Sequence, residues 1–129
     1  MEGSYVDRLR RAAAASIAAG LLLLGACQRA PEPAAGPQRL RVSLREFAFD
    51  PSEIEVRADA PVDLRLRNVG RIEHNWTLVA GDGREISYVL LEPGLRGRDR
   101  FTLASGTYDL LCTIEGHAEA GMRGTVTAG

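Results

Sequence analysis

Three side chains with metal-binding chemistry stand at even intervals near the end of the chain. Cys112, His117 and Met122 supply a thiol, an imidazole and a thioether, and four residues separate each one from the next. A soft thiolate, a borderline imidazole and a weak axial thioether together suit copper in a trigonal electron-transfer site. That geometry needs a second imidazole, and the only other histidine in the sequence is His74. These four residues are the candidate metal ligands.

The sequence around the spaced residues predicts the elements that position them. The apolar run at residues 108–111 predicts a strand that ends at Cys112. The β-prone run at residues 125–127 predicts a return strand that begins near Arg123. The loop between these two strands would then carry three of the four candidate ligands.

The residues of this loop and of residues 72–79 resemble those of a known family. The pair His74–Asn75, followed downstream by Cys-x4-His-x4-Met, resembles the blue (type 1) copper proteins, the cupredoxins. The spacing is most similar to auracyanin-like and azurin-like members, with plastocyanins as further relatives, and the resemblance runs over residues 47–128. It includes three glycines of the loop, Gly116, Gly121 and Gly124.

The resemblance implies one copper ion, cycling between Cu(I) and Cu(II), held by the four candidate ligands. It also implies that Asn75 ties the two ligand loops together and that its backbone N–H faces the Cys sulfur. The N–H of Ile114 is expected to reach the same sulfur, and such outer bonds tune the potential. Two positions depart from the family pattern: Glu115 replaces a common Pro, and Glu73 replaces the Gly of azurins. We therefore assign no fifth ligand.

Alternation of apolar and polar residues with a period of two repeats from residue 39 onward. Turn-forming residues separate these runs, and seven or eight short strands at such spacing predict an all-β, antiparallel sandwich with the Greek-key arrangement. The aromatic residues Phe47, Phe49, Trp76, Phe101 and Tyr108 are expected in its core. The expected strands cover residues 40–44, 54–56, 62–66, 76–80, 85–90, 99–103, 107–112 and 124–128.

The first 26 residues resemble a bacterial lipoprotein signal peptide. A basic start precedes the apolar residues 12–24, and Leu-Gly-Ala then leads to Cys27, which we expect to be acylated. A transmembrane anchor is the alternative, although a span needs about 20 apolar residues. Residues 27–38, rich in Pro and Ala, are expected to form a flexible linker, and residues 39–129 the folded domain. A disulfide between Cys27 and Cys112 is possible on paper, but the expected acylation gives Cys27 another role.

The charge balance excludes one class of partner. The chain has 129 residues, 45% of them hydrophobic, and this length and composition are enough for one small domain. Its formal net charge is −1. No basic stripe is concentrated in a single predicted element, so nucleic acid is not an expected partner.

Together these features predict a monomeric carrier of single electrons on the periplasmic side of a membrane. The resemblance implies partners such as a c-type cytochrome or a membrane electron-transport complex. Glu115 and Glu119 flank His117, and we expect them to bias encounter with a cationic partner. A copper enzyme would need further His ligands, and a dinuclear centre would need a second Cys in the loop. A copper carrier, storage or delivery protein stays open as an alternative.

Overall fold

Residues 36–129 fold into nine β-strands in the computed structural model, which describes this part of the chain. The strands are β1 (Gln38–Arg45), β2 (Ala48–Asp50), β3 (Glu53–Val56), β4 (Val62–Asn68), β5 (His74–Val79), β6 (Glu85–Leu91), β7 (Arg96–Phe101), β8 (Gly106–Leu111) and β9 (Arg123–Ala128). Within these residues no helix is apolar and long enough to span a membrane. The expected signal peptide, Cys27 and most of the linker lie outside the described residues.

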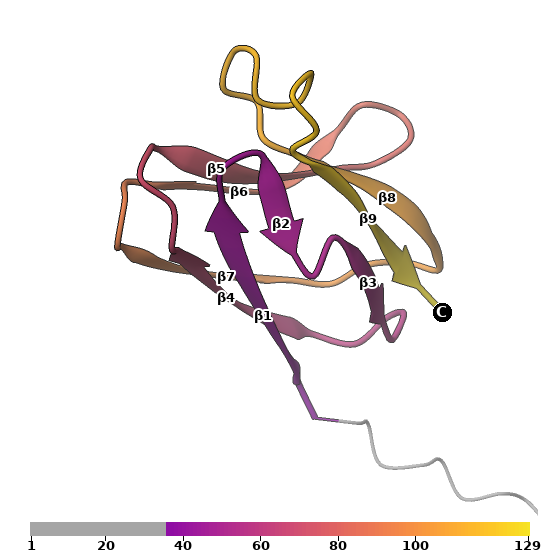
Figure 1. The fold of residues 1–129 in the computed structure, drawn as a ribbon. Coiled ribbons are helices and arrows are strands. Elements are labelled where there is room, and N and C mark those ends of the chain that lie inside the picture. Colours follow the sequence, from indigo (N-terminus) through magenta and orange to yellow (C-terminus); the bar gives the residue numbers. More distant parts are fainter. Residues whose placement is uncertain (1–35) are drawn as a thin grey trace, which may run out of the picture. The chain divides into compact units, whose positions relative to one another are not determined.

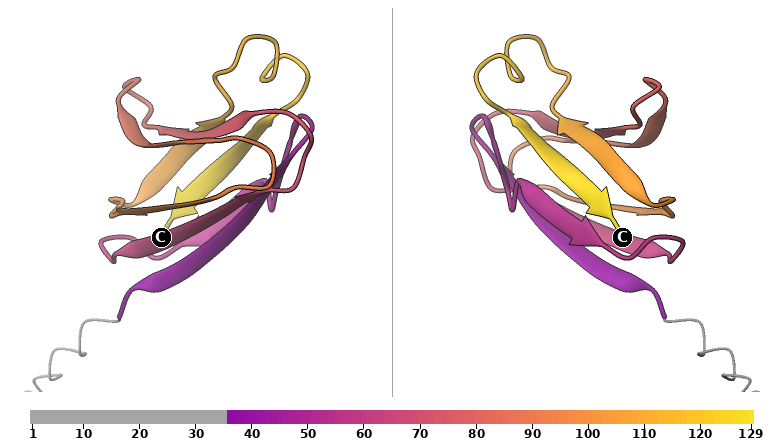
Figure 2. Two further views of the ribbon diagram at one scale, coloured as in Figure 1. Left: turned by 90° about the vertical axis from the view of Figure 1, so that its left-hand side faces the viewer. Right: turned by 90° about the vertical axis from the view of Figure 1, so that its right-hand side faces the viewer.

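The strands form two sheets that face each other, which confirms the predicted all-β sandwich (Figures 1 and 2). One sheet has the order β2-β1-β4-β7, and the other has the order β3-β9-β8-β5-β6. The purely antiparallel expectation is wrong, because β1 pairs with β4 in parallel and β3 pairs with β9 in parallel. After β2 the chain crosses from the first sheet to the second, and alternation within a strand carries no information about such a crossing.

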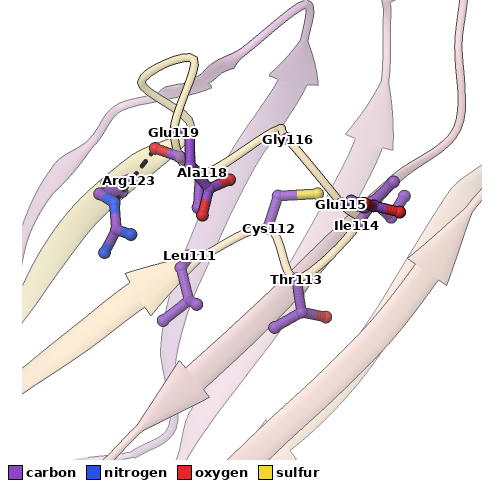
Figure 3. A pocket seen from close by; sticks show the side chains of 9 residues that line it. All are labelled: Leu111, Cys112, Thr113, Ile114, Glu115, Gly116, Ala118, Glu119 and Arg123. Atoms are coloured by element: carbon purple, nitrogen blue, oxygen red, sulfur yellow. Dashed lines mark hydrogen bonds between the residues drawn. The ribbon is translucent and has the colours of Figure 1, made fainter.

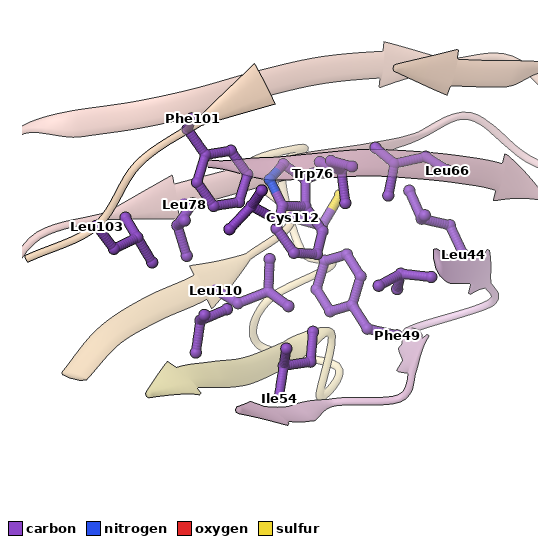
Figure 4. Close-up of a cluster of buried hydrophobic side chains, with 14 of the residues drawn as sticks. Leu44, Phe49, Ile54, Leu66, Trp76, Leu78, Phe101, Leu103, Leu110 and Cys112 are labelled. Atoms are coloured by element: carbon purple, nitrogen blue, oxygen red, sulfur yellow. The ribbon is translucent and has the colours of Figure 1, made fainter. Parts of the chain in front are cut away.

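The side chains between the sheets form one apolar core (Figure 4). Strand β4 shows the underlying pattern, since Val62, Leu64 and Leu66 are buried while the residues between them face outward. Trp76 is fully buried at the centre of the core, and Phe49 packs edge-on against it with ring centroids 6.1 Å apart. Burying such side chains stabilises the fold by about 1.5–3 kcal/mol each relative to exposure.

Two of the differences between the expected and the observed strands have a clear physical reason. The short strand β2 was not predicted, because three residues are too few to show alternation. Strand β7 starts at Arg96 rather than at residue 99. The earlier start was not predicted because the inward positions at the beginning of the strand hold Gly97 and Asp99 instead of apolar residues. Asp99 is satisfied there, since it accepts a hydrogen bond from the Ser87 hydroxyl at 2.6 Å.

The folded domain begins one residue earlier than predicted. The Gln38 N–H donates to the Pro61 carbonyl at 2.9 Å, and the Gln38 side chain exchanges hydrogen bonds with the backbone of Arg57. Gln38 is therefore the first residue of β1 rather than the last residue of a linker.

Candidate metal centre

Sheet topology brings the two ligand segments to one end of the sandwich. Strands β5 and β8 pair antiparallel, with Thr77 opposite Leu111, so the start of β5 lies beside the end of β8. His74 is the first residue of β5, and Cys112 directly follows β8. The loop over residues 112–122, which includes His117, then returns to β9, as predicted, and projects beyond the end of the sandwich (Figure 1).

Three of the predicted ligands meet at this end. The Nδ1 atoms of His74 and His117 lie 3.3 Å apart, and Nδ1 of His117 lies 3.4 Å from the Cys112 sulfur. One ligand atom from each of the three residues lies within 4.8 Å of the others. His74 and Cys112 are fully buried, and His117 is half-buried.

This arrangement fits a single bound metal ion. Nitrogen ligands lie about 2.0–2.1 Å and thiolate sulfur about 2.3 Å from a metal such as zinc, so donors spread trigonally around an ion are about 3.5 Å apart. The two measured separations, 3.3 and 3.4 Å, are close to this value. One thiol with two imidazoles is also the donor set of trigonal copper sites.

The surroundings of His74 favour the neutral imidazole, which is the form that binds a metal. Burial lowers the pKa of His74, and the nearby His117 lowers it further, while the Glu46 carboxylate acts in the opposite direction. A neutral imidazole has a free ring nitrogen for coordination. The other ring nitrogen, Nε2, is buried and has no hydrogen-bond partner among the described residues.

Asn75 joins the two ligand segments, as the resemblance implied. Its backbone N–H donates to the Cys112 sulfur at 3.4 Å, and its side-chain oxygen accepts the Thr113 N–H at 2.9 Å. Its side-chain amide donates to the Thr113 hydroxyl at 2.9 Å, and the Thr77 hydroxyl donates to its oxygen at 3.1 Å. These bonds fix the sulfur relative to β5.

The expected second N–H bond to the sulfur is not formed. Within residues 36–129, no hydrogen bond joins the Ile114 N–H to Cys112. The chain turns at this point instead, and the Ile114 carbonyl accepts the His117 N–H at 3.0 Å. The spacing along the chain could not show the direction in which the Ile114 N–H points.

Met122 is built into the base of the loop. Its side chain is fully buried in the same apolar cluster as Cys112. Its N–H donates to the His117 carbonyl at 3.0 Å, and its carbonyl accepts the Cys112 N–H at 3.1 Å. The backbone of Met122 thus contacts both neighbouring members of the motif, which fixes where its side chain enters the core.

The three glycines of the motif are required for two different physical reasons. Gly116 and Gly121 have φ values of 79° and 111°, which side-chain-bearing residues rarely adopt. Gly124 lies so close to the start of β3 that a Cβ atom would stand 2.2 Å from the Ser52 carbonyl oxygen. A loop of this shape therefore needs glycine at all three positions.

One aromatic residue of the site was assigned wrongly from the sequence. Phe47 was expected in the core, but it lies in the β1–β2 turn and is 40% exposed. Its ring packs edge-on against His117, with centroids 5.3 Å apart. Neighbouring Glu46 accepts the Arg71 N–H, which links this turn to the loop before His74. The contact between Phe47 and His117 was not predicted, because the two residues lie 70 positions apart in the sequence.

The acidic residues near the site are all on its surface. Glu73, Glu115 and Glu119 are exposed. Figure 3 shows Glu115 and Glu119 lining a hollow that also includes Cys112 and Arg123. Arg123 donates to the Ala118 carbonyl at 3.1 Å, and within the described residues it forms no ion pair with either glutamate.

A two-sheet sandwich with one buried thiol and two imidazoles between loops at one end defines a class of protein. The chain has the cupredoxin fold, and the solved structures that match it include auracyanins and other cupredoxins. No family model and no curated protein matches the chain.

Three auracyanins illustrate the similarity. Auracyanin B is 27% identical with a TM-score of 0.66, over 78% of this chain and 93% of that chain. Auracyanin A, a "blue" copper protein of Chloroflexus aurantiacus, is 26% identical with a TM-score of 0.66, over 73% and 100% of the two chains. The auracyanin of Roseiflexus castenholzii is 22% identical with a TM-score of 0.67, over 74% of this chain and 99% of that chain.

Proposed function

We propose that this protein holds one type 1 copper ion and carries single electrons between redox partners outside the cytoplasm. The observation that carries the proposal is the convergence of the Cys112 sulfur and two imidazole nitrogens at one end of a cupredoxin fold. The similarity to auracyanin A, a blue copper protein, supports it.

The residues of the site have separate roles in this proposal. Cys112, His74 and His117 would hold the ion, and the Met122 thioether would be a weaker fourth ligand. A bound copper ion supplies a one-electron Cu(I)/Cu(II) couple. Asn75 places an N–H dipole at the sulfur, which stabilises negative charge on the thiolate.

His117 is the proposed point of contact with redox partners. Of the three converging ligands it alone is partly exposed, while His74 and Cys112 are fully buried. The partner would meet the imidazole edge beside Phe47, and a c-type cytochrome or a membrane electron-transport complex suits this role. We propose no catalytic residue, because both histidines of the sequence lie in this one site.

Redox cycling of the copper-loaded protein tests the proposal. We expect repeated one-electron reduction and oxidation with one copper retained per chain, measured by voltammetry and by metal analysis after each cycle. Release of copper to a chelator on each reduction would contradict electron transfer and favour the delivery of copper instead.

We further propose that acylated Cys27 tethers the domain to the membrane on the periplasmic side. The support is the signal sequence ending in Leu-Gly-Ala-Cys27. Acyl chains bind a bilayer by about 0.8 kcal/mol per buried CH₂. Cys27→Ala should move the protein from the membrane fraction to the soluble fraction. Intact-mass analysis that finds an unmodified Cys27 on the exported protein would contradict this proposal.

A further inference from the structure

The outer face of the four-stranded sheet carries a ladder of arginines. In β1, β4 and β7, exposed arginines alternate with residues that face the core. The register places Arg41 opposite Arg65, and Arg65 opposite Arg98. The next row along the strands places Arg67 opposite Arg96. We call six residues of this ladder the arginine face: Arg39, Arg41, Arg65, Arg67, Arg96 and Arg98.

The six residues of the arginine face form no ion pair within the described residues, and Asp63 is the one acidic residue at the outward positions of β1, β4 and β7. The ion pairs of residues 36–129 join Arg45 to Asp50, Arg84 to Asp82 at 3.8 Å, and Arg100 to Asp63 at 2.7 Å. None of them includes a residue of the arginine face. Like charges at directly opposite positions of a sheet destabilise it. The ladder therefore works against the stability of the sheet, and an anionic partner would relieve the repulsion.

The composition of the face indicates which kind of anionic partner fits. Besides arginines, the outward positions of β1, β4 and β7 hold only Ser43 and Asp63. A protein–protein interface has an apolar core in which charged residues are depleted, and this face has no such core. It also has no aromatic ring on which a nucleic-acid base could stack. An anionic lipid surface requires neither feature, because it attracts basic residues by charge alone.

We infer that the arginine face docks the domain on the anionic phospholipid headgroups of a membrane. Guanidinium groups bind phosphate through paired hydrogen bonds, and a shallow groove lined by Arg41, Arg65, Arg67, Arg96 and Arg98 offers several of them together. The inference rests on the membrane location of the proposed function but not on its copper chemistry. From Cys27 to Gly36 the chain spans at most about 30 Å, so an acylated Cys27 would hold the domain near the headgroups.

This docking leaves the metal site accessible. The arginine face covers the side of one sheet, whereas His117 lies on a loop beyond the strand ends (Figure 1). With the sheet lying on the bilayer, the loop that carries His117 lies beyond the strand ends and not beneath the sheet. A membrane-bound redox partner could then meet it by lateral diffusion.

Vesicle partitioning of the full chain tests the inference. The measurement is the ratio of binding to equimolar phosphatidylcholine–phosphatidylglycerol vesicles over binding to pure phosphatidylcholine vesicles. The variant Arg41→Gln/Arg65→Gln/Arg98→Gln is compared with Arg57→Gln/Arg71→Gln/Arg84→Gln, which removes the same charge elsewhere. The N-terminal segment contributes equally to all three chains, so differences between them report on the arginines.

We expect the wild type to prefer anionic vesicles, and this preference to fall as salt screens charge over about 8–10 Å. A basic residue near an anionic surface contributes about 1 kcal/mol, or about fivefold in binding. The face variant should therefore lose the preference by about tenfold or more, and the control should keep it within about twofold. Equal losses in both variants, or a wild type indifferent to headgroup charge, would overturn the inference.

Two further readouts separate this inference from other outcomes. If the face variant partitions like the wild type but transfers electrons more slowly to an acidic redox protein, the partner is a protein and the membrane inference is wrong. The visible spectrum of the copper-loaded face variant should equal that of the wild type. A chain that binds anionic vesicles through this face but holds no copper would contradict the proposed function alone.

Discussion

The Cys112 sulfur is the most constrained atom of the site. It lies 3.4 Å from Nδ1 of His117 and accepts the Asn75 N–H at 3.4 Å, in a fully buried position. The imidazole of His74 is also buried, and this burial lowers its pKa and so favours the neutral form. Copper would therefore meet three donor side chains that already lie close together.

Met122 should tune the copper site rather than create it. An axial thioether binds weakly, so Met122→Gln should retain one copper per chain and lower the reduction potential, because an oxygen donor favours Cu(II). Voltammetry of both proteins gives the shift, and metal analysis confirms loading. An unchanged potential would show that the Met122 sulfur is only part of the core.

The β8–β9 loop depends on close packing against the start of β3. In Gly124→Ala the new Cβ would stand 2.2 Å from the Ser52 carbonyl oxygen, so the backbone must shift. We expect a loss of unfolding free energy of about 1–3 kcal/mol, the usual range for overpacking. Denaturant unfolding measures this loss, and Thr125→Ala, at the exposed next position, is the matched control. Equal stabilities of the two variants would contradict the close packing.

The turn between β1 and β2 should make a pH-dependent contribution to stability. A hydrogen bond from the Arg71 N–H lowers the pKa of Glu46 below its ordinary value of 4.5. A lowered folded-state pKa stabilises the fold above the unfolded value, and the contribution is lost as pH falls through the folded value. Glu46→Gln keeps an acceptor oxygen but does not titrate.

The stability difference between wild type and Glu46→Gln should therefore be constant above about pH 5 and shrink as pH falls below the unfolded pKa. Urea unfolding of the metal-free proteins at several pH values measures it, and the other carboxylates cancel in the difference. A difference that does not change down to about pH 3 would show that the Glu46–Arg71 bond contributes no stability in solution.

At the level of elements, sequence patterns predicted the positions of most strands and of the ligand loop. They did not predict contacts that depend on how distant strands and turns come together. The loop boundaries at Cys112 and Arg123 were predicted because an apolar run precedes the loop and a β-prone run follows it. The contact of Phe47 with His117 could not be predicted, because it depends on how the β1–β2 turn meets a distant loop. The arginine face was missed for the same reason, because only the register of three strands brings its arginines together.

At the scale of the whole molecule, two charged surfaces lie on different sides of the folded domain. The arginine face lies along one sheet, whereas Glu115 and Glu119 lie beside His117 at the end of the sandwich. Arg123 shares the hollow with these glutamates and weakens their field. In the account proposed here, this separation would let one surface orient the domain on a membrane while the other meets a redox partner.

The two loop carboxylates should act on the rate of encounter. Interface charges act mainly on association rate, so Glu115→Gln/Glu119→Gln should slow electron transfer to a basic cytochrome and flatten its salt dependence. Stopped-flow rates against ionic strength measure this effect, and Glu53→Gln/Glu55→Gln on exposed positions of β3 is the matched control. Superimposable curves for the site variant and the wild type would leave Glu115 and Glu119 as ordinary surface residues.

The visible absorption spectrum of the copper-loaded protein tests the central claim most directly. A Cys112 thiolate bound to Cu(II) together with two imidazoles should give an intense blue charge-transfer band, which reduction bleaches and Cys112→Ser abolishes. The His74, Cys112 and His117 donors already converge to within 4.8 Å, so the band should appear with one copper per chain. A wild-type protein that binds one copper and stays nearly colourless would contradict the type 1 assignment.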